Sequence, residues 1–157
     1  MSAPNSTLSL WQKLATKPGG KWLFSKLVCW KAPYFATIRP HFDELRPGHC
    51  AIVVPKRRAV QNHLGTMHAI AMCNMAELAG GTMTEISTPS THRWIPKGMT
   101  VEYLKKAETD LRAEAVFTRQ PEFGAASSVP VTVRVTDTNG QLVFRAEIGM
   151  WISPKKS

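Results

Sequence analysis

The chain has 157 residues, 43% of them hydrophobic and 20% charged, a composition that suits one domain with a buried core and excludes a disordered protein. No run approaches the roughly 18 apolar residues of a membrane-spanning helix, and no secretory signal is expected because Lys26 interrupts the most apolar N-terminal run. The net charge of +9 predicts an anionic partner: nucleic acid, an anionic membrane surface or a phosphorylated small molecule.

Residues 1–34 are expected to form a helical segment in front of the main domain, residues 35–153, within one domain overall. The opening residues through Thr7 show no pattern and are predicted to be disordered. Apolar residues at helical spacing then predict two short helices on either side of Pro18-Gly19-Gly20. These apolar residues are Leu8, Leu10, Trp11 and Leu14 in the first helix, and Trp22, Leu23, Leu27 and Trp30 in the second.

Extended structure is predicted from Phe35 to Leu45 and from Cys50 to Val54, joined by the turn Arg46-Pro47-Gly48. A loop from Arg57 to Gly65 follows. Residues Met67 to Leu78 then form the only long helix-forming stretch in the middle of the chain, and Gly80-Gly81 is expected to close it. Because this helix is apolar on nearly all sides, it is predicted to be buried.

The rest of the chain predicts four strands, because hydrophobic and polar residues alternate with a period of two. The turn Asp137-Thr138-Asn139-Gly140 makes a hairpin of the last two strands. The fold is therefore predicted as α+β, with an antiparallel sheet covering one long central helix. The four strands span residues 99–105, 111–118, 129–136 and 142–152.

The cysteines, Cys29, Cys50 and Cys73, are odd in number and widely spaced. This pattern predicts reduced thiols in the cytoplasm and no disulfide framework. No set of His, Cys and acidic residues has metal-site spacing. We therefore expect neither a metal nor another cofactor.

The segment Asn62-His63-Leu64-Gly65-Thr66-Met67-His68 leads directly into the central helix, which carries Glu77. This pattern resembles the signature of hotdog-fold thioesterases of the phenylacetate-pathway type, in which an Asn and then Gly-Thr-x-His-Gly-Gly open the central helix and a carboxylate lies nine residues after the His. The chain matches at Asn62, Gly65, Thr66, His68 and Glu77, and has Ala69-Ile70 in place of Gly-Gly. The resemblance covers roughly Phe35 to Ile152 and implies a hotdog fold and hydrolysis of an acyl-CoA thioester.

Thioester hydrolysis needs a carboxylate to activate water or attack the carbonyl, and donors for the oxyanion that develops. A helix N-terminus offers unpaired N–H groups. Family analogy gives the Ala69 N–H the oxyanion role and Glu77 the role of base or nucleophile. Asn62 and His68 would position the reactants, and Gly65 would help to bind the substrate.

Nine residues separate His68 from Glu77, which is about 900° of rotation and about 13 Å along a helix. One helix therefore points the two side chains in opposite directions. A site that uses both is most simply built from two chains, as the resemblance also implies. We expect a homodimer or a dimer of dimers.

The cluster Lys56-Arg57-Arg58 stands just before the motif and is predicted to bind the phosphates of coenzyme A. Nucleic acid is not expected, because the late strands lack interleaved basic and aromatic residues. The basic N-terminal helices would suit an anionic membrane, but their Pro-Gly-Gly break favours a cover over the sheet. A non-catalytic acyl or acyl-CoA binding protein, consistent with Ile70, remains the alternative to an enzyme.

Overall fold

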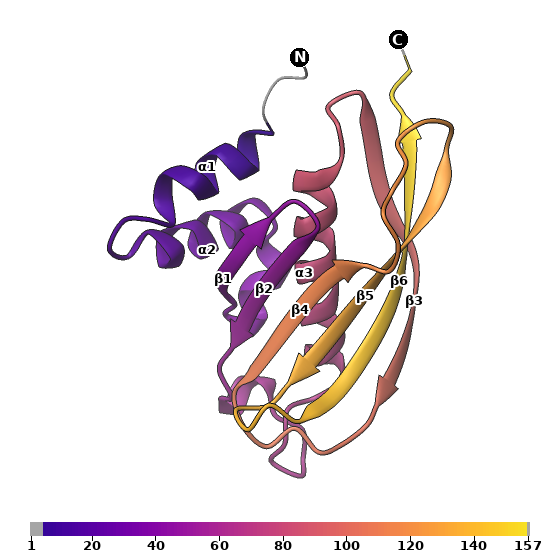
Figure 1. The fold of residues 1–157 in the computed structure, drawn as a ribbon. Coiled ribbons are helices and arrows are strands. Elements are labelled where there is room, and N and C mark those ends of the chain that lie inside the picture. The colour runs from indigo at the N-terminus through magenta and orange to yellow at the C-terminus, as the bar shows by residue number, and fades with distance from the viewer. Residues whose placement is uncertain (1–4, 157) are drawn as a thin grey trace.

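The computed structural model describes residues 5–156, in which a six-stranded antiparallel sheet curves around one long helix (Figure 1). The strand order is β1-β2-β4-β5-β6-β3, so that β1 and β3 are the two edges. This is the hotdog architecture that the sequence predicts. The elements are α1 (Ser6–Leu14), α2 (Gly20–Lys31), η1 (Pro33–Ile38), β1 (His41–Arg46), β2 (His49–Val54), η2 (Arg58–Val60), α3 (Ala69–Ser87), β3 (His92–Tyr103), β4 (Leu111–Phe117), β5 (Ser127–Thr136) and β6 (Leu142–Pro154).

The two N-terminal helices lie beside β1 and share its core. Trp11 of α1, Phe24 of α2 and Phe42 of β1 form a row of edge-to-face aromatic contacts, with ring centroids 5.1 and 5.2 Å apart. The prediction of disorder through Thr7 is wrong where it can be tested. The Asn5 carboxamide oxygen accepts hydrogen bonds from the Thr7 and Leu8 N–H groups and so starts α1. Residues 1–4 lie outside the described part.

The predicted strand from Phe35 to Leu45 is also wrong in its first half, where residues 33–38 form the 3-10 helix η1. Pro33 occupies the first helical turn, where its missing N–H costs nothing. Arg39 then turns the chain with a left-handed backbone (φ 48°), and β1 begins only after Pro40. As a result η1 lies across α3 instead of extending the sheet.

The central helix α3 continues to Ser87, two turns beyond the Gly80-Gly81 pair that was expected to end it. A Cβ at Gly80 would lie 3.1 Å from the Ile148 side chain, and one at Gly81 would lie 3.1 Å from the Trp94 ring. The glycines therefore serve close packing and not helix termination. The helix is not buried all round either, because Ile70 and Glu77 are exposed on the side away from the sheet.

The strands after α3 follow the predicted order, and the alternation of buried and exposed residues confirms their periodicity. The Asp137–Gly140 turn is also confirmed: the Asp137 carboxylate accepts from the Asn139 and Gln141 N–H groups, and Gly140 has a φ of 77°. Only β3 differs, since it begins at His92, well before the predicted Met99. No helix within residues 5–156 is both long and apolar enough to cross a bilayer.

Candidate active site

The motif begins with a tight turn, which the Asn62 side chain closes by hydrogen bonds to residues two and four positions further along the chain. Its carboxamide oxygen accepts from the Leu64 and Thr66 N–H groups at 3.0 and 3.2 Å, and its Nδ2 donates to the Thr66 hydroxyl at 2.9 Å. Gly65 completes the turn with a φ of 77°, a conformation that favours glycine. Asn62 is thus held rigidly, and one hydrogen of its Nδ2 remains for a ligand.

His68 is the N-cap of α3 and Ala69 its first residue. The His68 Nδ1 accepts from the Ile70 N–H at 3.0 Å, so the neutral ring carries its proton on Nε2, and the ring is exposed. The Ala69 N–H has no hydrogen-bond partner among the described residues. The start of α3 therefore presents donors that include the Ala69 N–H and the His68 Nε2–H, at the positive end of the helix dipole.

Glu77 lies two turns further along α3 and is exposed. It lines a mainly apolar cleft of about 360 Å³, whose walls include Val28, Phe35 and Leu78. His68 instead lines a separate cavity of about 160 Å³ on another side of η1. The two predicted residues are therefore not brought together within one chain.

Asn74, which was not predicted as a site residue, is the most buried polar group near the start of α3. Its side chain lines the same cavity as His68 and is 7% exposed. Its Nδ2 donates to the Thr37 hydroxyl at 3.2 Å, and its carboxamide oxygen has no partner within residues 5–156. In the sequence Asn74 stands out only as a single amide in an apolar helix. A sequence pattern cannot tell whether such a side chain is buried or exposed to solvent.

The predicted phosphate-binding residues Lys56, Arg57 and Arg58 adopt three different environments. The Arg57 guanidinium donates to the Thr37 carbonyl oxygen, and its buried Nε has no partner among the described residues. Burial, and then the nearby Arg39 charge, lower the pKa of Arg57. Lys56 donates its backbone N–H to the Asp110 carboxylate at 2.7 Å, whereas the side chain of Arg58 is exposed. Arg39 and Arg57 thus place two cations beside η1.

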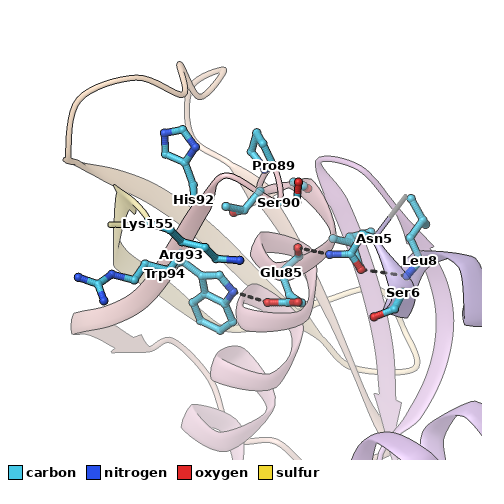
Figure 2. A pocket seen from close by; sticks show the side chains of 13 residues that line it. Asn5, Ser6, Leu8, Glu85, Pro89, Ser90, His92, Arg93, Trp94 and Lys155 are labelled. Carbon is cyan, nitrogen blue, oxygen red and sulfur yellow. Dashed lines mark hydrogen bonds between the residues drawn. The ribbon is translucent and has the colours of Figure 1, made fainter. Parts of the chain in front are cut away.

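A larger cavity, about 650 Å³, lies near the C-terminal end of α3 and contains none of the predicted site residues (Figure 2). Its lining is polar and apolar in about equal parts and includes His92, Arg93 and Lys155. At its base the Trp94 indole N–H donates to the Glu85 carboxylate at 2.6 Å. Asn5 donates to the Glu85 carbonyl oxygen at 2.9 Å, which ties α1 to α3.

Comparison with known proteins shows which family the chain belongs to. The family model described as domain of unknown function DUF4442 matches residues 20–152. The chain belongs to the DUF4442 family. This family match includes α2, η1 and every strand of the sheet.

Solved structures carry the same fold as this DUF4442 chain. The structural-genomics protein APC5556 is 48% identical, with 95% of this chain and 98% of that chain covered and a TM-score of 0.82. A Pseudomonas aeruginosa protein, PA5026, described as of unknown function and a probable thioesterase, is 25% identical, with 85% and 95% covered and a TM-score of 0.76. The Haemophilus influenzae thioesterase HI1161 is 8% identical, with 82% and 87% covered and a TM-score of 0.72. No curated protein matches the chain.

Proposed function

We propose that the protein hydrolyses an acyl-CoA thioester. The observation that carries this proposal is that α3 presents both an N–H without a partner among the described residues, at its start, and an exposed carboxylate, Glu77, which lines an apolar cleft. The word thioesterase in the descriptions of PA5026 and HI1161 agrees with this chemistry.

In the proposed reaction Glu77 takes a proton from water, and the resulting hydroxide adds to the thioester carbonyl. The Ala69 N–H and the helix dipole stabilise the oxyanion. Collapse of the tetrahedral intermediate breaks the carbon–sulfur bond, and the thiolate takes the proton from Glu77 to give a carboxylic acid and the free thiol. Direct attack by Glu77 on the carbonyl, followed by hydrolysis of the anhydride, is the second route. Asn62 and His68 position the reactants.

We propose that two chains complete each site, in a homodimer or a dimer of dimers. The motif and Glu77 line different hollows of one chain, so the second half comes most simply from a partner. The 12-residue strand β3 is an edge of the sheet and exposes Ile95, Met99 and Tyr103. An exposed edge strand presents unpaired backbone N–H and C=O groups and tends to pair with another chain. Tyr103 also contacts Cys73 of α3 at 3.5 Å, so this edge and the open face of the helix form one surface.

We further propose that Arg57 and Arg58, with Lys56, hold the phosphates of coenzyme A, since the Arg58 side chain is exposed and the Arg57 Nε is a donor without a partner within residues 5–156. Gly65 keeps the adjoining turn free of a side chain, so a substrate can approach its backbone closely. The helical segment 1–34 and the domain 35–153 are proposed to form one folding unit. The cytoplasm is the proposed compartment because the described cysteines are free thiols.

The test is thiol release from a panel of short, long and aromatic acyl-CoAs, with Glu77→Gln beside the control Glu122→Gln. Glu122 is an exposed loop carboxylate outside the two hollows that hold Glu77 and His68. General-base catalysis contributes about 10²- to 10⁴-fold, so Glu77→Gln is expected to lose at least about 10²-fold in kcat while the control keeps full activity. Equal turnover by both variants contradicts the proposal.

The alternative is an acyl-CoA binding protein without catalysis. Exposed Ile70 follows Ala69 and places a β-branched side chain where the family motif has glycine, which narrows the room for a thioester at the start of α3. Saturable binding of acyl-CoA without thiol release on any substrate of the panel would favour this alternative.

A further inference from the structure

The cleft beside Glu77 is built by segments that lie far apart in the sequence. One wall comes from the N-terminal helices, through Val28 and Lys31 of α2 and Phe35 of η1. The opposite wall consists of Trp94 and Pro96 of β3, and α3 forms the base between them. Its volume of about 360 Å³ falls within the roughly 300–1,000 Å³ typical of small-molecule pockets.

Trp94 closes one end of this cleft. Its ring packs on Gly81, where a Cβ would lie 3.1 Å from the ring edge, and its indole N–H is held by Glu85 at 2.6 Å (Figure 2). Both Trp94 and Glu85 line the 360 Å³ cleft and also the 650 Å³ cavity. The hydrogen-bonded pair is therefore the partition between the two spaces.

The order of residues along α3 gives the cleft a direction. Glu77 lies at one end, Leu78 and Gly81 follow along its base, and Glu85 stands at the partition. Eight residues of helix separate Glu77 from Glu85, which is about 12 Å. A thioester carbonyl beside Glu77 thus has an apolar channel of this length next to it.

We propose that this cleft receives the acyl group of the substrate, that the group is apolar and of medium length, and that the Trp94–Glu85 pair sets the upper limit on its length. The proposal rests on the proposed function only in placing the thioester carbonyl beside Glu77. An apolar group is favoured because Val28, Phe35, Leu78 and the Trp94 ring line most of the cleft.

The experiment measures binding instead of turnover. The full-length protein is titrated calorimetrically with S-alkyl-CoA thioethers of increasing chain length, which contain no carbonyl and cannot be hydrolysed. Each methylene that enters apolar surroundings is expected to raise the affinity about fourfold. For the wild type this rise ends at the length where the chain reaches Trp94.

Trp94→Ala removes the partition and is expected to extend the rise to longer chains, with at least tenfold tighter binding of a chain that the wild type excludes. Trp94→Phe keeps a ring on Gly81 and is expected to keep the limit. Trp151→Ala is the control, because that ring lies under Lys97 and lines neither space. Val28→Trp fills the cleft from α2 and is expected to weaken binding of all but the shortest chains, and this variant carries the test if Trp94→Ala does not fold.

An unchanged chain-length profile in both Trp94→Ala and Val28→Trp overturns the inference, even if thioesters are hydrolysed. A shifted profile in these variants supports the inference even if the wild type releases no thiol from any acyl-CoA. In that case the proposed hydrolase function fails and the acyl site stands. The two failures are therefore distinguishable.

Discussion

The adjacent glycines of α3 provide a sharp test of the packing, because they meet different neighbours. Replacing glycine by alanine inside a helix contributes about 1 kcal/mol of stability through backbone propensity. At Gly80 the new Cβ would meet the side chains of Ile148, Val131 and Met150 at 3.1, 3.4 and 3.5 Å. All three belong to the buried core, so they cannot easily move aside.

Overpacking of this kind costs about 1–3 kcal/mol, which outweighs the propensity gain. We therefore expect Gly80→Ala to lower the free energy of unfolding by about 1 kcal/mol. At Gly81 the close neighbour is the Trp94 ring, which is half-buried beside an open cleft and can shift by a few tenths of an ångström. Gly81→Ala is expected to be neutral or to stabilise by up to about 1 kcal/mol.

The measurement is urea unfolding followed by circular dichroism, with the m-value checked for each variant. The expected difference between the two variants is about 1–2 kcal/mol, with Gly80→Ala the less stable. Equal stabilities, or a Gly80→Ala that is more stable than the wild type, would refute the packing argument. An unchanged tryptophan emission spectrum in Gly81→Ala would contradict the contact between Gly81 and Trp94.

Three further outcomes are expected. Phe24→Ala empties the aromatic row between α1 and β1 and should cost about 3–5 kcal/mol in chemical denaturation, whereas exposed Trp22→Ala should cost about 0.5 kcal/mol or less. The Arg112 guanidinium, 2.5 Å from Asp43, lowers the pKa of that carboxyl. The ionised Asp43 therefore contributes fully to the free energy of unfolding above its unfolded-state pKa, and this contribution is lost as the pH falls through its folded-state pKa. In unfolding curves Asp43→Asn should cost roughly 0.5–1 kcal/mol at neutral pH, and a cost that persists in strong acid would contradict this assignment. Burial raises the pKa of the Cys50 thiol, so iodoacetamide labelling read by mass spectrometry should spare Cys50 until the protein unfolds.

The local elements of the fold could be read from the sequence because local physics sets them. The period-two alternation in β4, β5 and β6 appears wherever one face of a strand is buried, and it required no knowledge of the neighbours. The Asp137–Gly140 turn is likewise a property of its own few residues. Resemblance then supplied the hotdog arrangement of these parts.

Two of the errors fell where distant segments decide the outcome. Gly80-Gly81 looks like a helix end in sequence, but the close approach of Ile148 and Trp94 makes it part of the helix interior. The stretch after Pro33 looks like a strand, yet it packs across α3 as a 3-10 helix.

For the candidate site too, some features follow from the sequence and others only from the tertiary structure. The sequence by itself determined the local geometry of the motif, since the Asn62–His68 turn and the start of α3 are formed by neighbouring residues. Only the tertiary structure decided where these groups lie: Glu77 is exposed on a cleft, and His68 lines a different hollow. A periodic pattern reports that a side chain has one preferred face, but whether that face is covered depends on which remote segments pack against it. For Glu77 those segments are α2, η1 and β3.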